Sequence, residues 1–222
     1  MLEKSIAFLR KLKENNYKEW FHENKPMYDD AKKEFEDFVF SFVHVASQID
    51  KTIGTVEPKN CIFRIFRDIR FTNDKTPYKT NFGAYVAHGG GRKSEYAGYY
   101  FHLEPDKSLL AGGVWMPQPD ILKGIRSEIF NNIEEFNAII SHNDFKNHFG
   151  EISNEDMLKT APKNFPKDWP QINLLKYKSY TLAKSLSDDQ ICKGNLMEEI
   201  RTVNTAMLPF NNFINRVIED LR

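Results

Sequence analysis

The residues best suited to chemistry in this chain are the charged side chains between positions 63 and 80. Arginine and lysine alternate there with bulky apolar residues, and two aspartates lie among them. The charged residues are Arg64, Arg67, Asp68, Arg70, Asp74, Lys75 and Lys79. Guanidinium groups form strong, directional hydrogen bonds with carboxylate and phosphate oxygens, and burying them unpaired is costly. The stretch therefore predicts either a binding site for an anion or an ion network that locks the fold.

An alternating pattern over residues 61–71 predicts a β-strand that divides these charges between two faces. Arg64, Asp68 and Arg70 share one face, whereas Arg67 points to the other. Because Asp68 lies between two arginines, it would either orient one of them toward an anion or neutralise it.

A polar turn follows the predicted strand, over residues 72–76. Pro77 holds the residue before it extended, so Lys75 and Lys79 would fold back beside Arg70. The residues that we expect to bind an anionic ligand are Arg64, Arg67, Asp68, Arg70, Lys75, Lys79 and, from a later helix, Arg126.

A second glycine-containing turn links a predicted strand to that later helix. Gly112 and Gly113 end the strand, and the helix opens near Pro119. Glycine lets a backbone or a ligand approach closely, and a helix N-terminus favours anions. Tight packing of strand and helix is the alternative, and Arg126 would contribute only if this turn lies near the arginines.

Other motifs exclude several kinds of site. The loop Gly89–Ser94 does not have the spacing of a phosphate-binding P-loop, and its place between two strands predicts a hairpin tip. His88 and His102 flank this hairpin and could approach each other, but the six histidines have no metal-binding spacing. We therefore predict no metal and no cofactor.

Composition sets the broad class of the protein. The 222 residues suit a single domain over 1–222, and the 31 basic and 31 acidic residues give zero formal charge. Zero charge does not favour nucleic acid as a partner, although a local basic patch remains open. We also expect the aromatic residues of the 63–80 stretch to fill the core.

The sequence also predicts the compartment. Two distant cysteines, Cys61 and Cys192, and the lack of a long apolar run predict a cytoplasmic protein without a membrane segment.

The pattern of apolar residues predicts an α+β fold. Helical spacing at both ends of the chain encloses five segments with strand character. The predicted helices cover about 6–14, 24–50, 121–136 and 197–221, and the predicted strands 61–71, 82–86, 96–103, 109–115 and 174–186. We expect an antiparallel β-meander sheet covered by long N- and C-terminal helices.

Several of these segments together resemble one family. The chain is similar to the family called domain of unknown function 2461 in its residues 8–28, 63–80, 112–126, 162 and 175–178. The resemblance implies a single intracellular domain and brings no activity, cofactor or catalytic residue. Two positions depart from the family's pattern, because Asn164 replaces a glycine and Asn81 a histidine.

Three hypotheses remain open for the basic stretch. The first is a binding module for an anionic small molecule or phosphate group. The second is an enzyme in which Asp68 or Asp74 is the acid–base group. The third is a structural or interaction module with a buried ion network, in which loss of one arginine would destabilise the fold by about 3–5 kcal/mol. The residues do not predict the oligomeric state.

Overall fold

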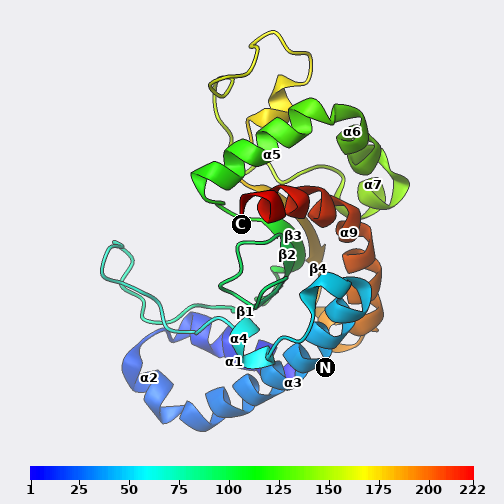
Figure 1. Cartoon of the computed structure of the whole chain (residues 1–222). Coiled ribbons are helices and arrows are strands. Elements are labelled where there is room, and N and C mark those ends of the chain that lie inside the picture. Colours follow the sequence, from blue (N-terminus) through cyan, green and yellow to red (C-terminus); the bar gives the residue numbers. More distant parts are fainter. The chain divides into compact units, whose positions relative to one another are not determined.

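The computed structural model describes residues 1–222, which form an α+β fold with a four-stranded antiparallel sheet (Figure 1). The elements are α1 (Glu3–Glu14), α2 (Lys18–Glu23), α3 (Lys25–Ile49), η1 (Lys51–Ile53), α4 (Pro58–Cys61), β1 (Phe82–Val86), β2 (Gly98–Leu103), β3 (Ser108–Val114), α5 (Pro119–Asn131), α6 (Ile133–Ser141), α7 (Asn143–Phe149), η2 (Ile172–Leu175), β4 (Tyr180–Leu186), α8 (Asp188–Cys192) and α9 (Leu196–Leu221).

The sheet has the strand order β1-β2-β3-β4, and helices flank it. The register of β1 on β2 pairs Phe82 with Leu103 and Val86 with Tyr99. Residues 82, 84 and 86 of β1 and 99, 101 and 103 of β2 are buried, as expected for strands with one face on a core. Gly83 of β1 is buried as well. The predicted antiparallel meander with long terminal helices is therefore confirmed.

The chain divides into two compact units. Unit 1 comprises residues 1–94, 99–110 and 185–202, and unit 2 comprises residues 95–98, 111–184 and 203–222. The prediction of one domain over residues 1–222 stays a prediction.

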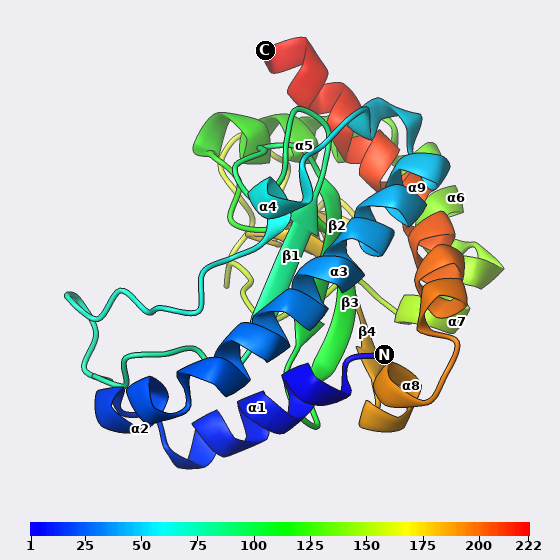
Figure 2. The same ribbon diagram turned by 90° about the horizontal axis from the view of Figure 1, so that it is seen from below.

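Unit 1 has an aromatic core between its helices and β1. Figure 2 shows α1 and α3 side by side, and the apolar stripe of α3 faces β1 and β2. The ring of Phe82 stacks on Phe8 and on Phe35, at centroid distances of 6.2 and 5.1 Å, while Phe38 packs on Phe101 at 4.4 Å. Each pair adds a geometric preference to the area that it buries, so this core fixes the position of α3 against β1.

Unit 2 is held together by the C-terminal part of α9. Phe213 of α9 packs on Phe136 of α6 at 5.0 Å. The buried amide of Asn215 bonds both the N–H and the C=O of Ala97, at 2.8 and 3.1 Å. These two bonds satisfy backbone groups that have no strand partner, and they tie α9 to the segment before β2.

The predicted strand over residues 61–71 is wrong. Cys61 instead ends α4, and the segment after it is extended but pairs only at isolated positions. The N–H of Arg67 bonds the C=O of Pro77 at 3.0 Å, and the N–H of Lys79 bonds the C=O of Ile65 at 2.8 Å. Since Pro77 has no N–H to return, the ladder stops there.

Residues 62–81, which we call the arm, leave the edge of the sheet and come back to β1. Figures 1 and 2 show the arm projecting as a long loop beyond the helices of unit 1, close to α2. Tyr78 anchors its base by stacking on Phe21 at 4.0 Å. The side chains of Phe66 and Phe71 are 48% and 92% exposed, so the expectation that the aromatic residues of this stretch fill the core is wrong for these two.

No helix of the structure combines the length and the apolar character that crossing a membrane requires.

Candidate functional site

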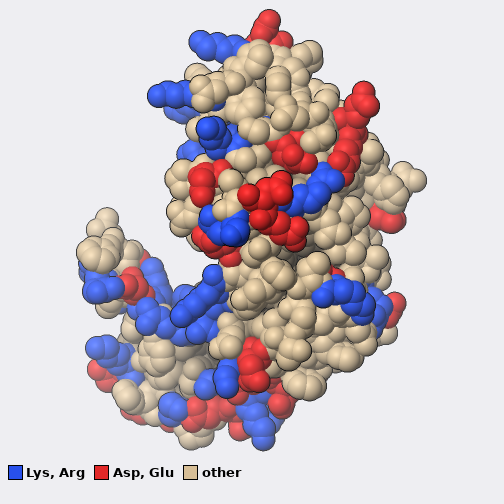
Figure 3. All heavy atoms as spheres, in the orientation of Figure 1, with Lys and Arg blue, Asp and Glu red and all other residues tan.

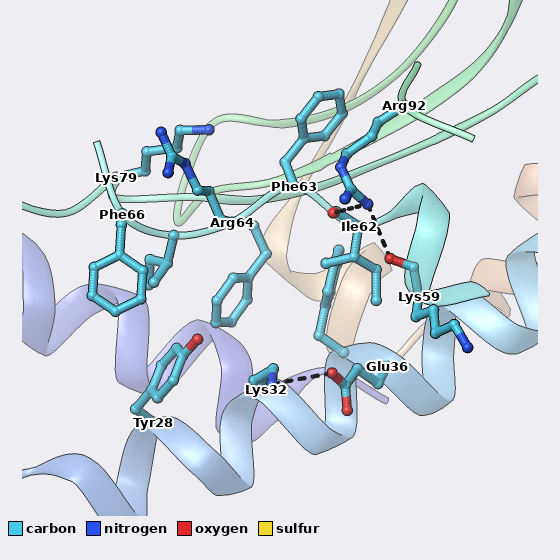
Figure 4. Close-up of a pocket in the computed structure, with 13 residues that line it drawn as sticks. Tyr28, Lys32, Glu36, Lys59, Ile62, Phe63, Arg64, Phe66, Lys79 and Arg92 are labelled. Atoms are coloured by element: carbon cyan, nitrogen blue, oxygen red, sulfur yellow. Dashed lines mark hydrogen bonds and ion pairs between the residues drawn. The ribbon is translucent and has the colours of Figure 1, made fainter. Parts of the chain in front are cut away.

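A pocket of about 590 Å³ lies in unit 1 between α3 and the start of the arm (Figure 4). Its volume is in the range of small-molecule sites. Five cationic side chains line it, together with aromatic rings and a single carboxylate. The lining residues are Tyr28, Lys32, Phe35, Glu36, Lys59, Ile62, Phe63, Arg64, Ile65, Phe66, Lys79, Phe82 and Arg92.

Helix α3 supplies one wall of the pocket. Tyr28, Lys32 and Glu36 follow one another at intervals of four residues, so one face of the helix presents all three. The ammonium of Lys32 pairs with the carboxylate of Glu36 at 3.4 Å. The only acidic residue of the pocket is therefore already matched by a base.

Arg92 enters the pocket from the glycine-rich loop. Its guanidinium donates to the carbonyls of Lys59, Asn60 and Ile62, at 3.0, 3.0 and 3.1 Å. A helix of four residues leaves its last carbonyls without partners, and Arg92 satisfies them. Gly91 makes this approach feasible, because a Cβ there would lie 2.4 Å from the carbonyl oxygen of Asn60.

Arg64 and Lys79 are the two predicted site residues that line the pocket. Figure 4 shows their side chains beside each other, pointing away from α3. Neither forms an ion pair, and Lys79 contacts the ring of Phe63, with its Nζ 5.6 Å from the centroid. Burial lowers the pKa of Lys79, and the positive charge of Arg64 lowers it further. Two cations without a counter-charge, one of them partly buried, form a site that an anion would stabilise.

The other predicted residues of the arm are satisfied among themselves. Arg70 forms a bidentate pair with Asp68, with Nε–Oδ1 and Nη2–Oδ2 distances of 2.9 and 2.7 Å. Arg67 bonds Asp74 and the hydroxyl of Thr76.

The last of these residues, Lys75, also bonds inside the arm, since its Nζ donates to the C=O of Ile69 at 2.9 Å. The structure thus separates Arg67, Asp68, Arg70 and Lys75, which order the arm, from Arg64 and Lys79, which line the pocket.

These ion pairs lie on the surface. The side chain of Arg70 is 75% exposed and that of Arg67 is 25% exposed. A buried ion network is therefore not what the arm contains. Figure 3 shows lysine and arginine gathered over the arm and the surface beside it.

The two aspartates of the arm are poorly suited to acid–base chemistry. Hydrogen bonds from the backbone N–H of Thr76 and from Arg67 lower the pKa of Asp74 to about 2. Hydrogen bonds from Arg70 lower the pKa of Asp68 as well. Both carboxylates stay ionised near neutral pH, and neither lines the pocket.

Arg126 belongs to unit 2, where it has a structural environment of its own. Its Nη2 donates to the C=O of Tyr177 at 2.9 Å, and its charge faces the buried hydroxyl of Tyr180. In the same unit Gly113, at φ +94°, leaves room for the C=O of Tyr180, which would lie 2.1 Å from a Cβ. Close packing is therefore what this glycine-containing turn requires.

A hydrogen-bonded relay lies on the outer face of β2 in unit 1. The hydroxyl of Tyr100 is 3.0 Å from Nδ1 of His102, and Nε2 of His102 is 3.1 Å from the carboxylate of Glu104. Phe63 of the pocket packs edge-on against Tyr100, at 6.1 Å between ring centroids. The predicted approach of His88 to His102 is wrong, because His88 bonds the C=O of Thr52 instead.

Comparison with known proteins identifies the family. The sequence signature described as "Conserved hypothetical protein (DUF2461)" matches residues 4–213. The chain belongs to this family. No curated protein and no solved structure matches it.

The two departures from the DUF2461 pattern have a physical explanation in the structure. Asn164 has φ +72°, in the left-handed region where glycine is favoured and asparagine is among the best tolerated alternatives. The amide of Asn81 lies 3.4 Å from Nδ1 of His102 and so joins the relay. Asn164 can therefore replace a glycine at this backbone conformation, and Asn81 places its amide beside His102.

Sequence reasoning missed most of the pocket wall. Lys32 and Lys59 come from separate helices, and Tyr28 carries no charge pattern of its own. The sequence holds one usable signal, which is Arg92 beside three glycines, because that combination indicates a close backbone approach. No group of three or more His, Cys, Asp or Glu residues that could hold a metal ion occurs in residues 1–222.

Proposed function

We propose that unit 1 binds a phosphate-bearing ligand in the pocket between α3 and the arm. The single observation that carries this proposal is that Arg64, Lys79 and Arg92 line one pocket while no carboxylate pairs with any of them. Phosphate oxygens accept charge-assisted hydrogen bonds from such groups. The ligand would take the place of the missing counter-charge.

The aromatic lining supports a ligand with an apolar part. Tyr28, Phe35 and Phe66 contribute ring surface beside the cations. Ligand sites commonly combine such surface with a few polar groups that fix orientation. A phosphorylated metabolite with a ring system fits this combination better than a bare inorganic ion.

The test is titration calorimetry with inorganic phosphate and thymidine monophosphate at low salt. Arg64→Ala and Lys79→Ala should each weaken binding about 10- to 100-fold, since a hydrogen bond to a charged group contributes about 1.5–3 kcal/mol. Lys33→Ala is the matched control, because this lysine lies next to Lys32 on α3 but outside the pocket. Unchanged affinity in both pocket variants would rule out the site.

A second candidate function, an enzyme, is favoured by the relay on β2. Glu104 accepts only, so Nε2 of His102 carries a proton and Nδ1 accepts from Tyr100. Burial, with a smaller effect of Glu104, raises the pKa of Tyr100 to about 12. The hydroxyl would pass a proton from a bound nucleophile to His102 without forming free tyrosinate.

Turnover of phosphate esters tests this second candidate. The wild-type protein should release p-nitrophenol from p-nitrophenyl phosphate, and Tyr100→Phe should lose at least tenfold in rate while phosphate affinity stays unchanged. Equal rates for wild type and variant would contradict a catalytic role for Tyr100.

We also propose that the protein works in the cytoplasm. Cys61 and Cys192 are both free thiols, which suits a reducing compartment.

A further inference from the structure

The arm exposes a large aromatic side chain to solvent, where such a side chain is normally absent. Phe71 lies in the exposed part of the arm and is 92% exposed. Its one aromatic or cation contact is with Arg70, whose guanidinium carbon lies 5.4 Å from the ring centroid. Most of the ring surface is therefore free to meet a partner.

A second aromatic platform lies at the base of the arm. Phe66 packs against Phe21 and Tyr78 at 6.0 and 5.5 Å, yet it remains 48% exposed and lines the pocket. Phe66 and Phe71 are thus two rings, held on one extended segment.

Basic side chains alternate with these rings. The stretch 63–80 contains five lysines and arginines and two aspartates, in a chain of zero net charge. Arg64 and Lys79 lie beside Phe66 in the pocket, and Arg70 lies over Phe71. The exposed Arg70–Asp68 pair is of a kind that contributes little to stability, so Arg70 can exchange its partner for a phosphate.

We propose that the arm binds single-stranded nucleic acid. Phe66 and Phe71 stack on bases, while Arg64, Lys79 and Arg70 contact the phosphates, as in sequence-tolerant single-strand sites. The inference rests on the proposed function, because the cation pair of the pocket holds one of the phosphates. It names the ligand class as a phosphodiester chain with accessible bases.

The tip of the arm favours this partner over an anionic membrane. Asp68 and Asp74 lie three residues to either side of Phe71, so insertion of this ring into a bilayer would take both carboxylates out of water, which is costly. A base stacks on one ring face without requiring the neighbouring residues to leave water. Paired bases in a duplex are not accessible to such a ring, so a single strand is the form that fits.

The test uses a fluorescein-labelled oligothymidylate of about 12 nucleotides, a length within the range of single-strand sites. Phe71→Ala should weaken binding about 5- to 150-fold and leave the salt dependence unchanged, because stacking releases no counterions. Arg64→Ala should weaken binding and reduce the slope of log K against log salt by about 0.7. The matched control is Phe40→Ala, an exposed phenylalanine of α3 outside the arm.

The outcomes separate this inference from the proposed function. Thymidine monophosphate should bind Phe71→Ala as it binds the wild type, whereas Arg64→Ala should lose affinity for both ligands. Equal oligonucleotide affinity for Phe71→Ala and Phe40→Ala overturns the inference. So does tighter binding to phosphatidylserine vesicles, or to a duplex, than to the single strand. If thymidine monophosphate binds Arg64→Ala with the affinity of the wild type, the proposed pocket is wrong.

Discussion

Lys79 and Arg64 lie side by side in the pocket of unit 1, two cations without an acidic partner. Like charges at close range normally separate or attract a carboxylate, because their repulsion grows as water is excluded. Here the backbone hydrogen bond from Lys79 to Ile65 fixes the position of Lys79 on the arm. The fold therefore maintains a concentration of positive charge that an anionic ligand would relieve.

The pKa of Lys79 should rise when Arg64 is removed. Burial is the larger cause of its depression and remains in Arg64→Ala, so the rise is partial. Heteronuclear NMR of the lysine Nζ resonances would measure it. Addition of phosphate to the wild type should raise the same pKa, because a bound anion favours the charged amine. A pKa that stays constant in both experiments would contradict the close approach of the two groups.

Asn16 should be worth more to stability than its neighbour Asn15. Its amide bonds the N–H and the C=O of Tyr78 at 3.1 and 2.9 Å, and so closes the base of the arm. Asn16→Ala leaves these partly buried backbone groups unpaired, and we expect a loss of about 1–3 kcal/mol in the free energy of unfolding. Urea denaturation would measure it.

The control for this prediction is Asn15→Ala. Asn15 makes one exposed bond, to the C=O of Lys11, and its loss should cost within about 0.5 kcal/mol. Similar losses for both variants would contradict the role of Asn16 at the base of the arm.

The elements that follow from local periodicity were predictable from the sequence. The apolar stripe of α3 has helical spacing, and β1 and β2 are rich in aromatic and β-branched residues, so all three elements were found. The prediction of a strand over residues 61–71 was wrong because alternation describes any extended backbone. A strand also needs a partner with free N–H groups. Pro77 cannot supply one.

The candidate site was only half predictable. Arg64 and Lys79 were found because they are close in the sequence and dense in charge. Lys32, Lys59 and Arg92 reach the pocket from three separate segments, and only the packing of α3 and α4 around the start of the arm brings them together. Similarly, the bidentate ion pair between Asp68 and Arg70 depends on the geometry of the loop.

Cys192 should react with an alkylating reagent before Cys61. Burial raises the pKa of the Cys61 thiol to about 11, so almost no thiolate is present at pH 8, and the side chain is fully buried. Cys192 is partly exposed, although burial also raises its pKa. Mass spectrometry after treatment with iodoacetamide should find one slow adduct, at Cys192, until denaturant exposes the second. Early modification of Cys61 would mean that α4 opens readily.

His102 should carry its proton on Nε2 at neutral pH. The acceptor Glu104 faces that nitrogen and the donor Tyr100 faces Nδ1. Nitrogen-15 NMR of the imidazole distinguishes the two tautomers. Glu104→Gln should allow both tautomers, because an amide offers a donor as well as an acceptor, while Tyr100→Phe should keep Nε2–H. A wild-type ring protonated on Nδ1 would exclude the relay.

Asp74 should hold the arm in place at all but very acidic pH. The backbone N–H of Thr76, then Arg67, lowers its pKa to about 2 in the folded protein, below the ordinary value of about 3.9. The native state therefore binds fewer protons than the unfolded state between these values. The stabilisation from Asp74 is fully present above about pH 4 and is lost as the pH falls through about 2.

Carboxyl carbon-13 NMR of Asp74 should give a midpoint near 2, and Arg67→Ala should raise it partway, since the bond from Thr76 remains. In Asp74→Asn the side chain keeps an acceptor for the N–H of Thr76 but has no carboxylate that titrates. The hydrogen-exchange rate of the Thr76 amide should then show no transition near pH 2. A wild-type midpoint near 3.9 would show that the arm does not hold Asp74 in these bonds.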